Sequence, residues 1–249
     1  MLGKHCFFCY CYTFTQSTYH LMNICHNLNH ITQIISQTAL ECNRAPSDIL
    51  LLAVSKQQNA ATITEAFQQG IKNFGENYYQ EALQKISELH HLPLCWHFIG
   101  PIQSNKTKGI ASHFSWVHSV DRIKIAKLLN EQRPVDLEPL NICLQINLLG
   151  EQSKSGIPPE QARELAQAVS QLPNLRLRGL MTIPPPEHDP QKQYEVFMQL
   201  NQLLHSLNQE LGLKMDTLSM GMSDDLAPAI KAGATIVRIG RAIFGERQS

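Results

Sequence analysis

Short apolar runs alternate with helical patterns along most of this chain. Eight of the runs are rich in β-branched or other apolar residues and end in turn-forming residues, which predicts strands. These predicted strands lie near residues 50–56, 73–76, 96–100, 115–120, 140–147, 175–183, 217–222 and 236–240. Between them, apolar residues recur every three or four positions, as is typical of amphipathic helices. A further helix is predicted before the first strand, over about Asn23 to Cys42.

This order of elements predicts the fold class. Strands that alternate with helices favour right-handed β-α-β units and a parallel sheet, which is an α/β fold. Eight such units in about 200 residues favour closure into a single (β/α)8 TIM barrel. An open doubly wound sheet is the alternative. The length of 249 residues suits one barrel, and we expect that barrel to span residues 22–249.

Residues 1–21 differ from the rest of the chain. They are rich in cysteine and aromatic residues, lack periodicity, and precede Met22, which stands at the start of the first helical pattern. We therefore predict that residues 1–21 are a disordered extension or a mis-assigned start. The apolar stretch is short and no small-residue cleavage site follows it, which argues against a secretory signal. Cys6, Cys9 and Cys11 lie close together, but without a partner cluster they are a weak zinc signal.

Composition narrows the function classes. The formal net charge is zero and no basic block stands out, which argues against nucleic acid or an anionic membrane as a partner. No run of about 18 consecutive apolar residues is present, so no transmembrane helix is expected. Cys25, Cys42, Cys95 and Cys143 are scattered through apolar patterns, which suits a reducing compartment. We expect a cytoplasmic protein.

The first predicted strand ends in a lysine. In the run 50–56, Lys56 lies where strand gives way to loop, which is the place where α/β folds bind ligands. A lysine that is partly desolvated there can attack a carbonyl group and form a Schiff base. The alternative is a lysine that only extends from a strand end into solvent.

Two glycine-containing turns follow the last two predicted strands. Residues 219–225 (Ser-Met-Gly-Met-Ser-Asp-Asp) lead into a helical segment, and residues 240–245 (Gly-Arg-Ala-Ile-Phe-Gly) form the second turn. In a barrel the loops after strands seven and eight often hold phosphate, so these turns resemble a two-loop phosphate cup. Ordinary turn chemistry is the alternative. A reactive lysine and a phosphate cup at one barrel mouth suggest a phosphorylated aldehyde such as pyridoxal 5′-phosphate (PLP).

Several motifs now resemble one known family. They are Val54-Ser-Lys56, Phe74-Gly-Glu-Asn77, residues 96–106, Ser153-Lys-Ser-Gly156, Arg178-Gly-Leu-Met181, residues 219–225 and residues 238–245. Together they are similar to the YggS/PROSC pyridoxal phosphate homeostasis proteins, over roughly Met22 to Arg247. The resemblance implies a barrel like the N-terminal domain of alanine racemase, PLP held by Lys56, and a role in binding and delivering PLP for vitamin B6 balance.

The resemblance also implies the cofactor-binding residues. Lys56 would carry the Schiff base, Arg238 would face the pyridine nitrogen, and Ser223, Gly240 and Arg241 would surround the phosphate. Many relatives carry threonine at position 241, so the contribution of the Arg241 side chain is open. The remaining residues of the predicted site, taken from the matching motifs, are Asn77, Ser219 and Met222.

A carrier is favoured over an enzyme, and no catalytic residue is predicted. An arginine opposite the pyridine nitrogen disfavours its protonation, which makes bound PLP a weaker electron sink. The resemblance to alanine racemase also calls for a tyrosine from a partner subunit, which this sequence does not offer; packing on a helix is the favoured role for Tyr78 and Tyr79. The alternatives are a racemase acting in a dimer and a Schiff-base aldolase without cofactor. We expect a monomer whose recipients are PLP-dependent apo-enzymes.

A group of histidines and a cysteine, two further lysines and a run of prolines are also candidate functional features. His90, His91, Cys95 and His97 are close in sequence, but their spacing fits no common ligand template, so no metal site is predicted. Lys106 and Lys154 are hypothesised to capture free cofactor before it reaches Lys56; the alternative is that both are simply solvated. The run 184–186 of three prolines predicts a stiff loop at the barrel mouth.

Overall fold

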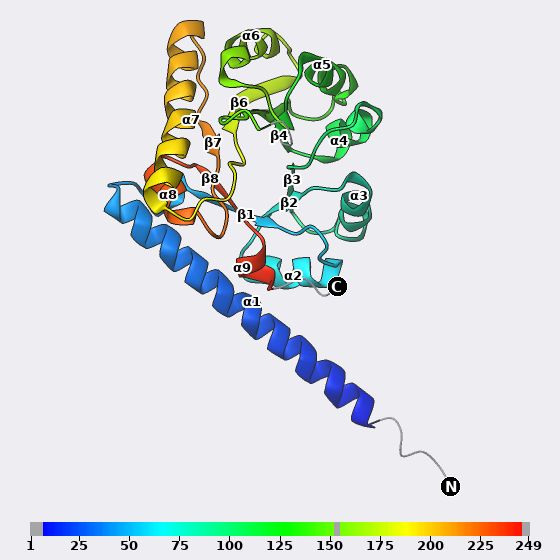
Figure 1. The fold of residues 1–249 in the computed structure, drawn as a ribbon. Coiled ribbons are helices and arrows are strands. Elements are labelled where there is room, and N and C mark those ends of the chain that lie inside the picture. The colour runs from blue at the N-terminus through cyan, green and yellow to red at the C-terminus, as the bar shows by residue number, and fades with distance from the viewer. Residues whose placement is uncertain (1–6, 152–154, 246–249) are drawn as a thin grey trace.

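The chain forms a closed parallel barrel surrounded by helices (Figure 1). The computed structural model describes residues 7–151 and 155–245, with side chains from residue 23 onward. The barrel order is β1 to β8 in sequence, and β8 pairs with β1 to close it. The strands are β1 (Leu50–Val54), β2 (Asn73–Glu76), β3 (Cys95–Phe98), β4 (Trp116–Val120), β5 (Leu140–Gln145), β6 (Leu175–Met181), β7 (Thr217–Ser219) and β8 (Ile236–Ile239). The predicted TIM barrel is confirmed.

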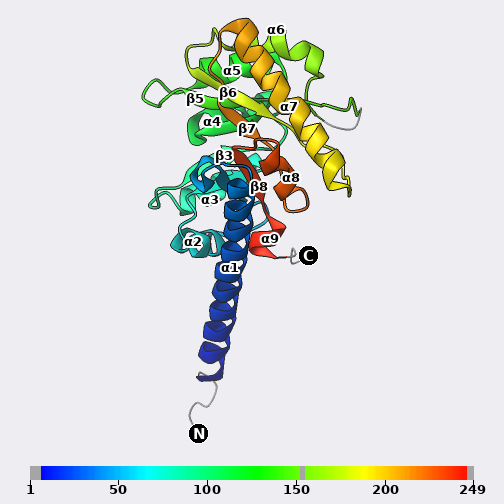
Figure 2. The same ribbon diagram turned by 90° about the vertical axis from the view of Figure 1, so that its left-hand side faces the viewer.

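The helices form the outer layer of the barrel (Figures 1 and 2). They are α1 (Phe7–Glu41), α2 (Ala60–Gln68), α3 (Tyr79–Glu88), α4 (Thr107–His113), α5 (Ile123–Gln132), α6 (Pro159–Val169), α7 (Pro190–Leu211), α8 (Leu226–Lys231) and α9 (Arg241–Phe244), with short 3-10 turns at Pro46–Asp48 and Ser104–Lys106. Among the helices of the described ranges, none combines the length and apolar character needed to cross a membrane.

Most strand positions were predictable, but several predicted strands run too far at their C-terminal ends. β7 ends at Ser219 rather than at residue 222, and β1 ends at Val54 rather than at residue 56. The cause is burial that continues past the strand ends, where the N–H groups of Ser55 and Met220 still donate to Gly75 and Ile236 of neighbouring strands. Met220 and Ser55 are fully buried although they lie beyond the strands, and an apolar or buried position in a loop has the same sequence pattern as one in a strand.

The first helix begins at Phe7, well before the predicted start near Asn23. Its later turns pack against α8 and α9 through a buried apolar stripe that includes Ile24, Leu28 and Ile31. Its first turns project away from the barrel (Figure 1). Residues 1–6 and the side chains of residues 7–22 lie outside the described part, and with them Cys6, Cys9 and Cys11. The separate character of residues 1–21 therefore stays a prediction.

The core has two parts. The large part lies between the strands and the helices, where every other strand residue points outward. The smaller part fills the barrel interior, where Leu52, Ile99 and Ile236 pack together next to Trp116. Polar side chains, including His97, share that interior. The barrel is therefore a filled scaffold that holds the loops at one end in place.

Candidate functional site

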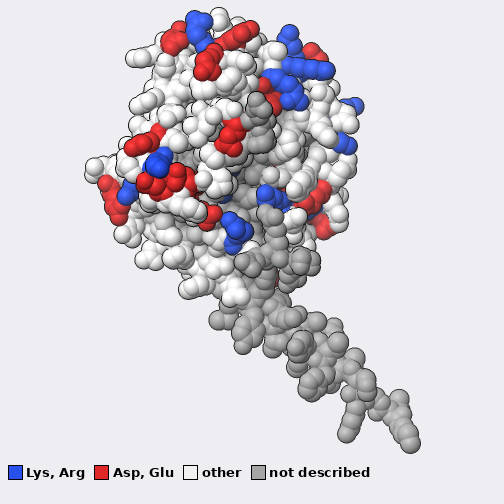
Figure 3. All heavy atoms as spheres, in the orientation of Figure 1, with Lys and Arg blue, Asp and Glu red and all other residues white. Residues whose placement is uncertain are grey.

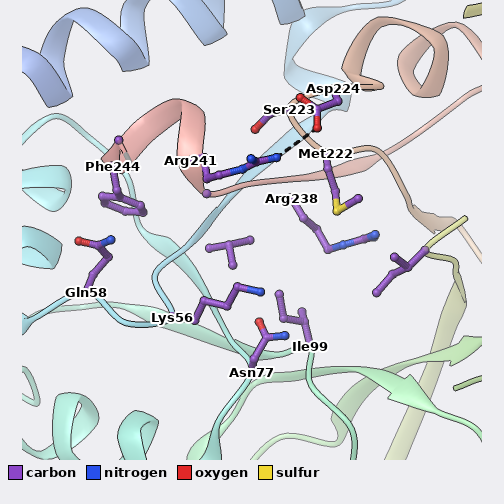
Figure 4. Close-up of a pocket in the computed structure, with 14 residues that line it drawn as sticks. Lys56, Gln58, Asn77, Ile99, Met222, Ser223, Asp224, Arg238, Arg241 and Phe244 are labelled. Carbon is purple, nitrogen blue, oxygen red and sulfur yellow. Dashed lines mark hydrogen bonds and ion pairs between the residues drawn. The ribbon is translucent and has the colours of Figure 1, made fainter. Parts of the chain in front are cut away.

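A cavity of about 530 Å³ opens at the C-terminal ends of the strands (Figure 4). That volume is in the range of small-ligand pockets. Its walls come from the ends of β1, β2 and β3 and from the loops that follow β6, β7 and β8. The lining residues are Val54, Lys56, Gln58, Asn77, Ile99, Ile183, Met222, Ser223, Asp224, Arg238, Gly240, Arg241, Phe244 and Gly245.

Lys56 stands two residues beyond β1 and is half-buried. The backbone before it is anchored to the sheet, because the N–H of Ser55 donates to the carbonyl of Gly75 at 3.0 Å. The backbone after it turns tightly: Gln57 has a left-handed φ of 63°, and the N–H of Gln58 donates to the carbonyl of Ser55. This turn directs the Lys56 amine into the cavity, between Asn77 and Arg238 (Figure 4).

A buried charge cluster supports that turn. The Lys85 amine on α3 donates to the backbone carbonyl of Ser55 at 2.7 Å and to the carboxylate of Glu76 at 2.8 Å. Glu76 also accepts from the Ser55 hydroxyl at 2.6 Å, and Glu81 accepts from both Lys85 and the backbone N–H of Gln57. Burial raises the pKa of Glu76 despite its lysine partner. The cluster fixes the residues on both sides of Lys56.

Asn77 lines the cavity and carries an acceptor atom that no described residue uses. Its Oδ1 atom is buried and has no hydrogen-bond partner among the described residues. A buried polar atom without a partner costs roughly 1–3 kcal/mol, so such an atom in a cavity wall suits a ligand donor. The backbone of Asn77 is held in place by a close approach to Gly100, where an added Cβ would lie 2.0 Å from the Asn77 carbonyl oxygen.

Arg238 supplies a buried cation at the base of the cavity. Its guanidinium donates to the hydroxyl of Ser219 at 2.9 Å and to the backbone carbonyl of Thr182 at 2.8 Å. Burial lowers the pKa of Arg238 to about 10, and the nearby Asp225 acts in the opposite direction. Arg238 therefore remains charged at neutral pH.

The loops after β7 and β8 form the far wall. Gly221 has a φ of 91° and lies so close to helix α8 that an added Cβ would be 2.6 Å from the Cβ of Ala229. Its carbonyl accepts from the N–H of Arg238, which ties the loop after β7 to strand β8. Asp225 stabilises the first loop by accepting from the N–H of Met222. Across this wall, Arg241 and Asp224 form an ion pair at 3.2 Å (Figure 4).

Charges of both signs are interspersed over the face shown in Figure 3, and the formal net charge of the chain is zero. Within the described residues, His, Cys, Asp and Glu do not form a group of three or more that is suited to a metal ion. His97 is buried in the barrel interior, whereas His90 and His91 lie on the surface beyond α3. The four candidates of the sequence pattern are thus divided between two places.

The fold and cavity agree with comparisons to known proteins. A family model described as the alanine racemase N-terminal domain matches residues 20–248. The pyridoxal phosphate homeostasis protein of Pseudomonas aeruginosa is 57% identical over 227 residues, which cover 91% of this chain and 97% of that protein. This chain belongs to the pyridoxal phosphate homeostasis protein family. The Escherichia coli K12 member is 50% identical over 228 residues, covering 90% of this chain and 97% of its own length.

Solved structures of other proteins resemble this chain in fold. PipY of Synechococcus elongatus, solved with PLP bound, is 37% identical with a TM-score of 0.76, and the match covers 85% of this chain and 100% of PipY. Alanine racemase from Corynebacterium glutamicum is 18% identical with a TM-score of 0.69, over 91% of this chain and 62% of the racemase. The second likeness shows that the barrel is shared between the family and the racemases.

The structure brings most of the predicted site residues together. Seven of the eight line the cavity: Lys56, Asn77, Met222, Ser223, Arg238, Gly240 and Arg241. Ser219 is the exception, because it is fully buried beneath the cavity and contacts Arg238 instead.

The other candidates lie away from the cavity. Tyr78 is exposed, and Tyr79 packs its hydroxyl against Gly109 with Lys106 above its ring, 5.7 Å from the ring centre. None of these residues lines the cavity. Lys154 lies outside the described residues. The packing role expected for Tyr79 matches its position on the helix side of the barrel.

Sequence reasoning missed several lining residues. The lining residues that were not predicted are Val54, Gln58, Ile99, Ile183, Asp224, Phe244 and Gly245. All lie in a quoted motif or at a predicted strand end except Gln58, which is two residues after Lys56. Their common signal is position at the C-terminal rim of the barrel. The charge cluster around Lys85 was also missed, because Lys85 lies on helix α3 and is not part of any motif in the sequence.

Proposed function

We propose that this protein binds pyridoxal 5′-phosphate in the cavity and acts in intracellular vitamin B6 homeostasis, holding the cofactor on Lys56 and delivering it without catalytic turnover. The observation that carries the proposal is the arrangement of three groups around one cavity. The Lys56 amine, the Arg238 guanidinium and the two glycine-containing loops all line it. PLP has an aldehyde, a ring nitrogen and a phosphate, which are the three features such a site would hold.

The residues present fit the cofactor. The Asn77 Oδ1 atom lacks a partner among the described residues and can accept a hydrogen bond from a ligand. Ser223 and Arg241 offer a hydroxyl and a cation beside the glycine-containing loops, which suits a phosphate. When bound, PLP supplies an aldehyde that forms a Schiff base with a lysine amine and a ring that withdraws electrons. PipY, a relative of this chain, was solved with PLP bound.

Arg238 favours holding over catalysis. If the pyridine nitrogen of bound PLP faces Arg238, the positive charge would repel a proton there and keep the ring a weak electron sink. Racemisation also needs a second acid or base across the ring. In the described part of the chain, the titratable groups that line the cavity are Lys56, Asp224, Arg238 and Arg241. Asp224 lies beside Ser223 and Arg241, at the end of the cavity proposed to hold the phosphate, so it is not placed across the ring as a second base (Figure 4).

The test of binding is covalent trapping. Protein incubated with PLP is reduced with borohydride, digested and mapped by mass spectrometry. We expect the adduct on Lys56, and its loss together with the loss of yellow colour in Lys56→Ala. Lys124→Ala removes an exposed lysine on α5 and serves as the matched control. A colourless wild-type protein that forms no adduct would reject the proposal and leave a cofactor-free aldolase as the alternative.

A second measurement separates a carrier from a racemase. PLP-loaded protein is incubated with single-enantiomer alanine and other amino acids, and the enantiomers are separated by chiral chromatography. We expect no accumulation of the opposite enantiomer. Steady accumulation that disappears in Lys56→Ala would identify an enzyme.

The remaining parts of the proposal concern the surroundings of the protein. We propose that it works in the cytoplasm as a monomer and passes PLP to PLP-dependent apo-enzymes. The four cysteines with described side chains, Cys25, Cys42, Cys95 and Cys143, are free thiols, which is compatible with a reducing compartment. Capture by Lys106 or Lys154 before transfer to Lys56 stays a hypothesis. Adduct mapping on Lys56→Ala protein tests it, since an adduct on neither lysine would exclude it.

A further inference from the structure

A continuous line of hydrogen bonds runs through the barrel interior and ends at Arg238. The Arg238 guanidinium donates to the Ser219 hydroxyl at 2.9 Å. Ser219 lies 2.7 Å from Nδ1 of His118, and Nε2 of His118 lies 3.0 Å from Nδ1 of His97. Nε2 of His97 then lies 3.1 Å from Oδ1 of Asn73 and 3.4 Å from the Sγ atom of Cys95, which can share the same proton as a weak acceptor. The line therefore connects β2, β3, β4, β7 and β8 below the cavity.

The two ends of the line determine its protons. Arg238 can only donate, and Oδ1 of Asn73 can only accept. His97 therefore donates from Nε2 and accepts at Nδ1 when it is neutral. His118 then donates from Nε2 and accepts at Nδ1 from the Ser219 hydroxyl, whose lone pairs accept from Arg238. Every bond is satisfied with both histidines uncharged.

The surroundings favour this uncharged state. His97 and His118 are fully buried, and His97 stacks on Trp116 with ring centres 5.5 Å apart. Burial lowers the pKa of His97 to about 3 and that of His118 well below its ordinary value, to which the charge of Arg238 also contributes. Neither histidine is part of the cavity wall.

Arg238 thus has neutral acceptors on both of its bonded nitrogens. Nη1 donates to the Ser219 hydroxyl oxygen, and Nη2 donates to the carbonyl oxygen of Thr182. Neutral acceptors fix the direction of a guanidinium without neutralising its charge, whereas a carboxylate partner would do both. A flexible arginine is in this way held as a fixed cation at the base of the cavity.

We propose that Ser219, His118 and His97 are positioning residues. They would hold the Arg238 guanidinium so that its charge points at the ring nitrogen of bound PLP. The inference rests on the proposed function, because it assigns these residues to the same site. It adds a role for three buried polar residues that do not line the cavity. It also gives a role to the one predicted site residue that lies beneath the cavity rather than in its wall.

The test measures the ring nitrogen directly. Wild-type, Ser219→Ala and Ser119→Ala proteins are loaded with PLP labelled with ¹⁵N in the ring, and the ¹⁵N resonance and the PLP affinity are measured. Ser119 is the matched control, because it is also a buried barrel serine, but its hydroxyl donates to the Gly100 carbonyl. We expect Ser219→Ala to move the resonance and weaken PLP binding about three- to tenfold, since the hydrogen bond that orients the guanidinium is lost while Arg238 keeps its bond to Thr182. Ser119→Ala should leave the resonance unchanged.

A second variant covers the case in which Ser219→Ala does not fold. His118→Leu leaves the Ser219–Arg238 bond in place but removes the acceptor of the Ser219 proton, so we expect a smaller shift in the same direction. A wild-type resonance in both folded variants, or in His118→Leu alone if the other does not fold, would overturn the inference. Wild-type protein that binds no PLP would instead reject the proposed function.

Discussion

Arg241 adds an exposed positive charge to the wall of the cavity. Its guanidinium lines the cavity and pairs with Asp224 at 3.2 Å, and both side chains are largely exposed, at 66% and 81%. An exposed ion pair contributes at most about 1 kcal/mol and is screened by salt. A bound phosphate can therefore compete with Asp224 for the same guanidinium.

The Arg241→Thr variant tests this competition. We expect PLP affinity to fall about two- to fivefold at low salt and the difference from wild type to shrink in high salt, because the lost interaction is an exposed one. Absorbance titrations at two salt concentrations measure both effects. Arg163→Thr is the control, since Arg163 is exposed and pairs with Glu210 away from the cavity. Equal affinities of wild type and Arg241→Thr at both salt concentrations would show that Arg241 takes no part in binding.

The connection between β1 and α2 depends on a helix that is not adjacent in sequence. Lys85 of α3 bonds to Ser55 and to the buried Glu76, and Glu81 holds the N–H of Gln57. Removing one member of a buried ion pair leaves its partner without compensation, which costs roughly 3–5 kcal/mol. The position of Lys56 thus rests on a charge cluster outside the cavity.

Lys85→Met should therefore destabilise the protein by about 3–5 kcal/mol in urea unfolding. We expect the double variant Lys85→Met with Glu76→Gln to recover part of the loss, because the unpaired carboxylate is gone. Lys124→Met, which changes an exposed lysine, should stay within about 0.5 kcal/mol of wild type. A loss of similar size in Lys85→Met and Lys124→Met would contradict the buried pairing.

Strand packing at Gly179 allows a second prediction for the elements. A Cβ at this position of β6 would lie 1.7 Å from the Thr217 carbonyl oxygen of β7, so the two strands cannot keep their spacing. Gly179→Ala should therefore lower the free energy of unfolding several times more than Gly70→Ala. A Cβ added at Gly70 would have no atom within 4 Å, but alanine there would be strained by the φ of 95°. That strain amounts to roughly 1 kcal/mol. Thermal unfolding of both variants measures the difference, and equal melting temperatures would contradict it.

The sequence predicted the elements better than the contacts between them. Strand positions follow from apolar runs, and cavity residues such as Lys56 and Arg238 follow from their place at strand ends. The hydrogen bond between His118 and Ser219 joins residues 101 positions apart across the closed barrel. Such contacts depend on closure and on which side of each strand faces inward. A register error of one residue would have reversed those sides, so the pattern alone could not predict the contact.

The whole molecule combines a rigid barrel with a cavity at one end. The outer core between strands and helices is apolar, whereas part of the barrel interior is polar and includes two neutral histidines. Because these histidines support both the interior and Arg238, the stability of the fold and the order of the cavity depend on the same protonation state.

This dependence predicts a loss of stability in mild acid. His97 has a pKa of about 3 in the folded protein against an ordinary value of 6.5, so the unfolded chain binds more protons between these limits. Stability conferred by neutral His97 and His118 is complete above about pH 6.5 and falls as the pH decreases, by roughly 1.4 kcal/mol per pH unit for each histidine. Burial raises the pKa of Glu76 and of Asp225 in the folded protein. These two carboxyl groups therefore add stability as the pH decreases, but they do so nearer pH 4.

The window from pH 6.5 to 5 therefore isolates the histidines. Urea unfolding of apo-protein across this window should show the wild-type slope reduced by about half in His97→Gln, because one titrating group is gone. His205→Gln changes an exposed histidine on α7 and should keep the full slope. Reduced starting stability in His97→Gln does not affect the comparison, since the slope reports only the difference in bound protons. An unchanged slope would mean that His97 is already protonated in the folded barrel, which would break the hydrogen-bonded line that ends at Arg238.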